Sequence, residues 1–391
     1  MDCGSLSINY SLEKLEQYIV SQNFQGYDPY DILNSLILGR IIKGSHKYVQ
    51  IFATQFNRLC PLNKRNILRV KKDFNSKAMA LFTSGYLTLY KKNKQKEYLD
   101  KAIFCLNWLE QNNCENFDNE YGLGFTFNIM MKTYSLNKGK SSVIISIYAG
   151  NAFIDAYEIL GDEKYLKWAI AVGNFLINQV PIVRINNNSL WFSYLVSGLF
   201  ECYNVTSHAA ALLARIYFHT KDSLMLKYSS HAMNYIIKKQ RNDGSWKYAE
   251  NINWTDNYHT GFVLESLAKY MKMTDDHRYA NQLEKGIQHY KKYMFLATGQ
   301  PILYHPKYRP NLLRRMQART DIRDCAQGII VFKILNSAES DLFASKIASW
   351  TIKEMQSQHG YFFYQANHFF KIKIPYIRWQ AWMLLALSYL I

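Results

Sequence analysis

The feature that most constrains the fold is a recurring pair of helical segments. Amphipathic segments begin near residues 98, 165, 226, 279 and 342, so successive repeats lie 67, 61, 53 and 63 residues apart. Each follows, after a short polar turn, a segment that is apolar on most sides, such as residues 209–214. A helix that is apolar nearly all round is buried, whereas a two-faced helix lies at the surface. The pattern therefore predicts an all-α fold, an α/α toroid with an inner and an outer ring of helices.

The apolar segments set the expected size of the ring. We expect inner helices at residues 31–43, 76–91, 143–160, 204–219, 256–271 and 321–335, and a last apolar helix at 375–391. A short amphipathic helix at 11–20 would pair with the last helix and close the ring. Six or seven hairpins in one domain over residues 1–391 are expected from this count, with weak strand signals confined to the loops.

In an alternating toroid every inner helix starts at the same end, so the inner N-termini and the loops before them share one rim. Polar, ionisable and aromatic residues concentrate at these positions, where they are costly unless they are paired or used. The residues expected to contact a ligand are Tyr27, Asp28, Trp191, Tyr194, His208, Trp246, Arg323, Gln327, Arg378 and Trp379.

Four rim residues could carry acid/base chemistry: His259, Tyr258, Asp256 and Asp324. His259 is a candidate general base, although a buried histidine bonded to a backbone carbonyl is the alternative. Asp256 precedes a helix, as an N-cap would. Asp324 lies one turn inside its helix, where we expect a salt bridge or a catalytic role rather than a cap. A paired-carboxylate glycosidase would need Asp256 and Asp324 at roughly 5–5.5 Å or 6.5–9.5 Å across the sugar.

The arginines and tryptophans each have two interpretations. Arg323 and Arg378 suit a carboxylate or phosphate, or form salt bridges between helices, for example to Asp324 or Asp28. Trp191, Trp246 and Trp379 suit sugar faces, and packing explains any one of them equally well.

The chain has 391 residues, a net charge of +17 and 15% aromatic residues. Such a charge favours acidic partners, namely nucleic acid, an anionic membrane or an acidic glycan, and plain solubility is the alternative for lysines at exposed helical positions. No nucleic-acid motif is evident in the pattern. We expect an acidic glycan or sugar precursor as ligand, no nucleic acid, and peripheral contact with an anionic membrane.

The six cysteines form no CxxC motif and pair with no histidine at zinc spacing, so we expect no disulfide framework, no metal and no other cofactor. The N-terminus has no basic region and apolar core of a signal peptide, and no 18-residue apolar span is evident. A cytoplasmic location is the resulting expectation.

Some motifs resemble known families. Residues 240–246 (QRNDGSW) resemble the turn motif of α/α-toroid enzymes such as terpene cyclases, with a degraded copy at 356–362, but the acidic motif of those cyclases is missing. The stretches at 26–31, 256–262, 321–328 and 376–379 together resemble α/α-toroid proteins of bacterial surface-polysaccharide gene clusters. The Tyr-His-Thr stretch at 258–260 is similar to one in glucuronyl C5-epimerases.

The resemblance implies a six-hairpin-glycosidase-like fold and a role in the biosynthesis of surface polysaccharides. Our leading hypothesis is a carbohydrate-active enzyme of surface-polysaccharide biosynthesis, an epimerase, lyase or glycoside hydrolase acting on an acidic glycan. The alternatives are a non-catalytic glycan-binding or scaffold toroid and, disfavoured by the polar rim, a terpenoid-type cyclase.

Overall fold

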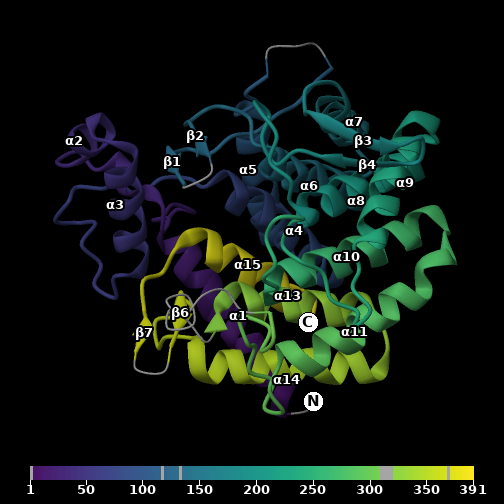
Figure 1. Ribbon diagram of the computed structural model, residues 1–391. Helices are drawn as coiled ribbons and strands as arrows, with labels where there is room; N and C mark the ends of the chain where they lie inside the picture. The colour runs from purple at the N-terminus through teal and green to yellow at the C-terminus, as the bar shows by residue number, and fades with distance from the viewer. Residues whose placement is uncertain (1–2, 116–118, 132–133, 309–319, 368–369) are drawn as a thin grey trace.

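The computed structural model describes residues 3–115, 119–131, 134–308, 320–367 and 370–391, and its regular secondary structure is mainly helical (Figure 1). Six helices form a closed inner ring in which each packs against its neighbours and the last packs against the first. In ring order they are α4 (Ser76–Asn93), α6 (Val143–Leu160), α8 (Tyr203–Thr220), α10 (Asn257–Thr274), α13 (Ile322–Ile334) and α15 (Ile377–Ser388). Their side chains are buried on most faces, as the all-round apolar pattern requires.

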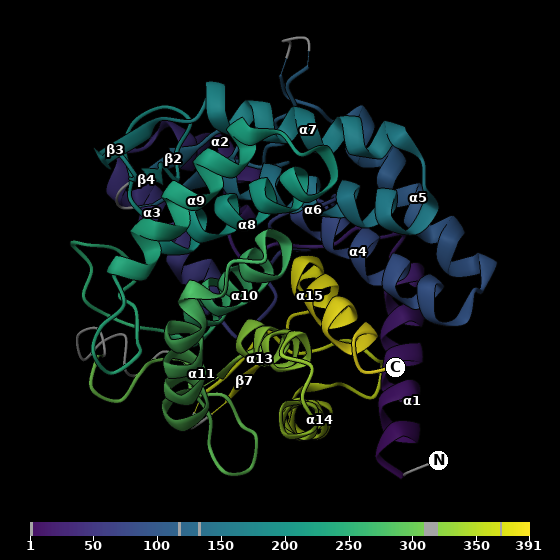
Figure 2. The ribbon, with the colours of Figure 1, turned by 90° about the vertical axis from the view of Figure 1, so that its right-hand side faces the viewer.

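Each inner helix has a partner on the outside. The partners, in the same order, are α5 (Lys96–Gln111), α7 (Glu163–Asn178), α9 (Ser223–Lys238), α11 (Ala280–Met294), α14 (Ala338–Met355) and α1 (Cys3–Ser21). Helix α1 packs against α14 and α15, so the two ends of the chain close the ring (Figure 2). The described residues thus form six hairpins, which confirms the α/α toroid.

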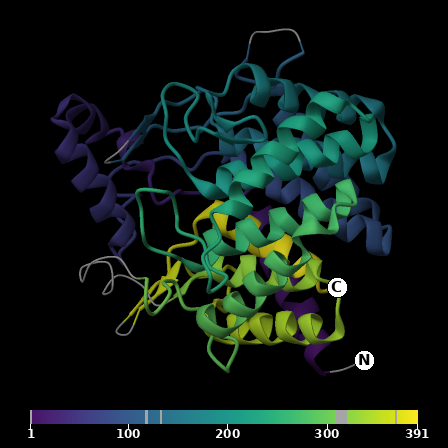
Figure 3. The ribbon, with the colours of Figure 1, turned by 45° about the vertical axis from the view of Figure 1, so that its right-hand side comes forward.

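One expected inner helix is absent. Residues 31–43 form a short 3-10 turn, η1 (Asp31–Asn34), and the six-residue helix α2 (Gly39–Gly44), followed by α3 (Lys47–Leu59). The prediction of an inner helix at 31–43 was wrong because the apolar residues there are not directed into the ring. Several are exposed instead. In Figures 1 and 3 this purple segment stands at the left edge of the molecule, on the side of the β1, β6 and β7 loops.

The loops between hairpins carry short antiparallel strands. These are β1 (Ile129–Met130) with β2 (Ser135–Leu136), β3 (Ile182–Asn186) with β4 (Ser189–Phe192), and β5 (Thr320–Asp321) with β6 (Gln365–Ala366) and β7 (Lys371–Ile372). A further 3-10 turn, η2 (His277–Tyr279), precedes α11. Strands are confined to the loops, as the sequence predicted.

A glycine turn ends three of the outer helices. At residues 241–245, Gly244 has a φ of +87° and its N–H donates to the carbonyl of Arg241. Gly299 and Gly360 occupy equivalent turns with φ of +88° and +91°. The copy around Gly360 matches the degraded motif seen in the sequence. The copy around Gly299 lacks the flanking glutamine and tryptophan and was not predicted.

Helix α6 is long and apolar enough, by length and composition, to cross a membrane, although no such span was expected from the sequence. It is also a mostly buried helix of the inner ring, between α4 and α8. Its composition is therefore explained by its place in the core.

Candidate functional site

The N-termini of the inner helices meet at one end of the ring, and short backbone pairings tie them to the loops. Tyr27 pairs with Tyr376 just before α15, and Asp256 pairs with Tyr304. Polar side chains lie in the first turns of five inner helices at this end, namely α4, α8, α10, α13 and α15. The arrangement predicted from the alternation of helices is therefore present.

The rim contains a histidine–carboxylate pair at the start of α10. Asp256 is the N-cap of the helix and accepts the backbone N–H of His259 at 3.3 Å. Its carboxylate also contacts Nδ1 of His259 at 2.7 and 2.9 Å. Asp256 is thus both cap and charge partner. A buried acceptor at Nδ1 places the proton there and leaves Nε2 as the basic nitrogen.

The His259 ring lines a small hollow between α8 and α10. Aromatic rings surround it: Tyr248 lies edge-on at 4.7 Å between centroids, Tyr258 at 4.1 Å and Trp254 at 6.1 Å. The side chain is 18% exposed and its carboxylate partner 3%. The imidazole is therefore fixed in orientation while one edge remains open to a ligand.

Arg323, at the start of α13, lies next to Tyr258. Its guanidinium stacks 4.0 Å from the centroid of the Tyr258 ring. Nε and Nη2 each donate to Asp321 at 2.9 Å, in the bidentate geometry typical of arginine. Burial alone would raise the pKa of Asp321, but Arg323 and the amide of Gln365 hold it below its usual value. Asp321 is thus ionised, and its carboxylate holds the Arg323 guanidinium in place.

Asp324 is not a free carboxylate. It is the third residue of α13 and forms a capping box, in which its Oδ2 accepts the backbone N–H of Asp321 at 3.0 Å. The expectation that a cap could not explain Asp324 was wrong, because a capping box uses this position. Burial and the neighbouring Asp321 charge raise its pKa well above the usual value. Its side chain is fully buried, so it cannot face Asp256 across a sugar.

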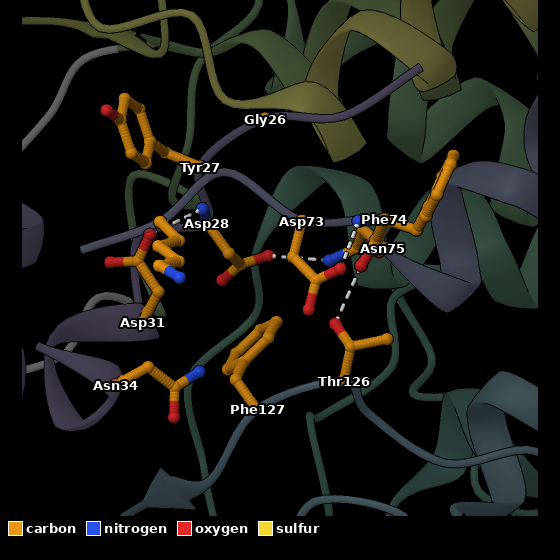
Figure 4. A pocket seen from close by; sticks show the side chains of 11 residues that line it. Gly26, Tyr27, Asp28, Asp31, Asn34, Asp73, Phe74, Asn75, Thr126 and Phe127 are labelled. Carbon is orange, nitrogen blue, oxygen red and sulfur yellow. Dashed lines mark hydrogen bonds between the residues drawn. The ribbon is translucent and has the colours of Figure 1, made fainter. Parts of the chain in front are cut away.

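Arg378, in the first turn of α15, is held from the other side. Nη2 donates to both carboxylate oxygens of Asp28 at 3.0 and 3.2 Å, which confirms one of the salt bridges considered. Asp28 also accepts a hydrogen bond from Asn75, and it lines a small hollow (Figure 4). Tyr27 lines the same hollow and donates to Asn66 at 2.6 Å.

Lys77 is a rim residue that sequence reasoning missed. It lies in the first turn of α4, with Nζ 4.2 Å from the centroid of the Tyr148 ring. Burial lowers its pKa well below the usual value, and the charges of Arg378 and Arg323 lower it further. Within the described ranges no carboxylate lies within 4.0 Å of its Nζ. No local sequence pattern distinguishes Lys77 from the many surface lysines.

Two other candidates lie deeper in the ring. His208 on α8 is buried, with Nδ1 3.2 Å from the hydroxyl of Ser266, and its Nε2 has no partner among the described residues. Burial lowers the pKa of His208 to about 3, so the ring is neutral. Gln327 is fully buried and donates to Glu265 at 2.7 Å. These two residues form a polar layer below His259 and Arg323.

The aromatic candidates separate into packing residues and rim residues. Trp246 is 2% exposed, and its indole N–H donates to the carbonyl of Ile236 at 2.9 Å. Trp379 is fully buried and donates to Asp321 at 3.2 Å. Both arrangements favour packing over ligand stacking. Tyr194 is half-buried beside Tyr134, and burial raises its pKa to about 12.

Trp191 stands apart from the other candidates. It lies on β4, opposite Val183 of β3, and packs half-buried against the core. No hydrogen bond or ring contact joins it to the histidine or the arginines in the part of the chain that the structure describes. The structure therefore does not bring Trp191 to the candidate site.

The assembled site consists of one oriented imidazole, the guanidinium groups of Arg323 and Arg378, and the amine of Lys77, around a shared rim. No group of three or more His, Cys, Asp and Glu suited to a metal ion occurs among the described residues. An oriented imidazole can transfer a proton, and guanidinium groups can hold a carboxylate or phosphate.

Comparisons with known proteins define the class of fold as an α/α toroid of the six-hairpin glycosidase type. No protein-family model and no curated protein sequence matches the chain. Solved structures do. Cellobiose 2-epimerase from Bacillus thermoamylovorans has a TM-score of 0.60 at 10% identity, covering 81% of this chain and 90% of that one.

Two further structures are similar in fold. A glycosyl hydrolase of family 88 from Bacteroides vulgatus has a TM-score of 0.59 at 12% identity, with 98% of each chain covered. A polysaccharide lyase has a TM-score of 0.56 at 15% identity, covering 80% of this chain and 88% of that one. All three neighbours are carbohydrate-active enzymes by name. At these identities the likeness establishes the fold.

Proposed function

We propose that this protein is a carbohydrate-active enzyme that moves a proton on an acidic glycan or glycan precursor. The observation that carries the proposal is the His259–Asp256 pair, with Nδ1 of the imidazole 2.7 Å from a buried carboxylate and one ring edge open at the rim. This arrangement supplies a base of fixed orientation.

The cations around the rim define the substrate charge. Arg323 and Arg378 each have one carboxylate partner, and Lys77 has none within 4.0 Å among the described residues. A uronate carboxylate next to the reacting carbon would complete this set. It would also stabilise the carbanion formed when His259 removes the neighbouring proton, because the charge spreads onto the carboxylate held by the cations.

The roles of the four catalytic candidates therefore differ. His259 takes the proton, and Asp256 is a positioning residue that acts through His259. Burial raises the pKa of the Tyr258 phenol well above its usual value, so this group keeps its proton and can act only as a donor. Asp324 has no proposed catalytic role, because it is buried in the capping box.

Epimerisation and elimination both begin with this proton abstraction, and they differ in the fate of the carbanion. Return of a proton to the opposite face gives the epimer, whereas loss of the group on the next carbon gives an unsaturated sugar. Hydrolysis by paired carboxylates receives less support, since Asp324 cannot face Asp256. The epimerase and the lyase among the structural neighbours are consistent with either course.

We place the enzyme in the cytoplasm and in surface-polysaccharide biosynthesis. The support is the resemblance of residues 26–31, 256–262, 321–328 and 376–379 to toroid proteins of such gene clusters.

The test is a screen of acidic and neutral oligosaccharides in heavy water, followed by mass spectrometry and NMR of the products. Deuterium at the carbon that bears the carboxylate with the chain intact indicates epimerisation, and an unsaturated product indicates elimination. New reducing ends with only saturated products would indicate hydrolysis and contradict the proposed proton abstraction. Binding with the glycan returned intact and free of deuterium would favour the non-catalytic glycan-binding toroid, and no binding to any glycan would contradict the proposal.

A further inference from the structure

The segment between the rim and α4 combines an exposed apolar surface with charged side chains that are all positive. We call residues 32–72, which include α2 and α3, the basic arm. Nine of the 20 exposed large hydrophobic residues among the described residues lie in the basic arm, which is about a tenth of the chain. They are Leu36, Ile37, Ile41, Tyr48, Val49, Phe52, Phe56, Leu62 and Ile67.

Helix α3 directs its apolar stripe away from the protein. Tyr48, Phe52 and Phe56 follow one another at intervals of four residues and are 68%, 70% and 54% exposed. The Phe52 and Phe56 rings stack with centroids 6.1 Å apart. The polar residues Thr54 and Asn57 lie on the buried side instead. A globular protein normally orients an amphipathic helix the other way.

The arm is fixed to the rim by buried polar contacts. Asn57 donates to the carbonyl of Pro29 at 3.2 Å. Arg65 pairs with Asp31 at 2.9 Å, with both side chains almost fully buried. Helix α3 is therefore held firmly against the protein, and its apolar stripe is exposed even though the helix is in place. A contiguous exposed apolar patch of this kind marks an interaction site.

The charge of the arm identifies the partner. Residues 32–72 contain nine lysines and arginines and no aspartate or glutamate. Arg40, Lys43, Lys47, Arg69, Lys71 and Lys72 are exposed, and Nζ of Lys64 lies 5.2 Å from the Phe56 ring. Pairing two copies through this surface would bring like charges together with no acid to balance them. Aromatic and aliphatic side chains among cations match the interface of an anionic lipid bilayer.

We infer that the basic arm docks the protein on anionic membrane surfaces, with the stripe of α3 inserted at the level of the headgroups and the cations on the lipid phosphates. This inference is independent of the proposed function, because none of the arm residues in the stripe belongs to the His259 site. The docking would place the rim of the toroid beside the bilayer, since Asp31 and Pro29 join the arm to the rim.

The experiment is co-sedimentation of the full chain with vesicles of phosphatidylcholine alone and of phosphatidylcholine with phosphatidylglycerol. We expect binding to the anionic vesicles that weakens in high salt, and little binding to the neutral ones. The variant Phe52→Ser/Phe56→Ser should lose about tenfold or more in affinity, because two inserted aromatic side chains are removed. The replaced side chains are exposed, so the variant should fold normally, which circular dichroism checks.

The matched control is Leu224→Ser/Leu342→Ser, which removes two hydrophobic side chains that are 47% and 73% exposed outside the arm. It should bind anionic vesicles as the wild type does. Three results would overturn the inference: no binding to anionic vesicles, equal loss in both variants, or a lipid-free dimer that Phe52→Ser/Phe56→Ser dissociates. The last would assign the stripe to a second copy of the chain.

Discussion

At the residue scale, the Lys77 side chain lies at the rim, with its Nζ over the Tyr148 ring. Burial lowers the pKa of Lys77, and Arg378 and Arg323 add to that effect. The unfolded state therefore binds more protons than the folded state between the folded pKa and the usual value of 10.5. In that window stability rises with pH. At neutral pH Lys77 therefore lowers the free energy of unfolding. A ligand carboxylate bound beside it would offset this loss.

We therefore expect Lys77→Met to raise the free energy of unfolding at neutral pH while weakening binding of an acidic glycan by about tenfold, as for the loss of one charge-assisted hydrogen bond. Urea unfolding and glycan titration measure the two effects. Lys91→Met, on the exposed end of the same helix, should change neither. A Lys77→Met variant that is less stable than the wild type would show that the ammonium group is not a cost to folding.

His208 gives a second prediction, on pH. Its folded pKa of about 3 lies below the unfolded value of 6.5, so the unfolded state binds the extra proton between these values. Stability should be lost as the pH falls below 6.5 toward 3, at up to about 1.4 kcal/mol per pH unit from this one group.

The measurement is urea unfolding of the wild type and of His208→Gln at neutral and at mildly acidic pH. The variant should lose less stability on acidification, although it is less stable at neutral pH. Identical acid losses in the two proteins would mean that His208 is not the group that takes up the proton.

The sequence indicated His259 but not Lys77, for a physical reason. Asp256 and His259 are three residues apart at a helix start, so a local pattern already brings their side chains together. The position of Lys77 depends on α6, α13 and α15, which contribute Tyr148, Arg323 and Arg378. Asp324 was misassigned because the capping box also depends on the conformation of Asp321, which the sequence alone does not fix.

At the scale of the element, the turn around Gly244 joins one hairpin to the next. Its positive φ favours glycine, and a Cβ atom there would lie 2.4 Å from the carbonyl oxygen of Lys285. Gly161 has a similar φ of +73°, but a Cβ atom there would meet nothing within 4 Å. Substitution of Gly161 would therefore test backbone strain alone, whereas substitution of Gly244 would test strain together with a steric clash.

We expect Gly161→Ala to cost about 1–2 kcal/mol of unfolding free energy, the usual strain of a left-handed residue. Gly244→Ala should cost more than that, because the α9–α10 loop must also move away from α11. Denaturant unfolding measures both. Equal losses would indicate that the contact with Lys285 relaxes without cost.

The existence and order of the inner helices from α4 onward were the most predictable part of the fold. The inner helices at 143–160 and 204–219 were placed within one residue of α6 and α8, since their apolar faces are continuous. The basic arm was missed because an exposed apolar stripe and a buried one have the same periodicity. What distinguishes them is the absence of acidic residues from 32 to 72, which the sequence shows plainly.

At the scale of the whole molecule, the ring depends on closure between its two ends. Leu12, Leu15 and Ile19 of α1 are buried against the core. Ser11 and Gln356 exchange hydrogen bonds of 2.7 and 2.9 Å that join α1 to the end of α14. Closure is therefore a long-range contact between the first and last parts of the chain.

Leu15→Ala should reduce the free energy of unfolding by about 2–5 kcal/mol, as for a buried leucine in a tightly packed core. Tyr10→Ala, on the exposed side of the same helix, should change it by about 0.5 kcal/mol or less. Thermal unfolding monitored by circular dichroism compares them. Similar small losses for both would mean that α1 is only loosely packed and that the ring is stable without it.

The measurement that tests the central claim most directly is deuterium exchange into an acidic oligosaccharide in heavy water, with His259→Asn beside His277→Asn. His277 forms a similar pair with Asp275, 3.0 Å apart, but on the exposed surface at the opposite end of α10. We predict that His277→Asn exchanges deuterium as the wild type does, and that His259→Asn still binds the oligosaccharide but exchanges at least about 100-fold more slowly, the contribution of a general base. Undiminished exchange by His259→Asn would contradict the assignment of His259 as the base.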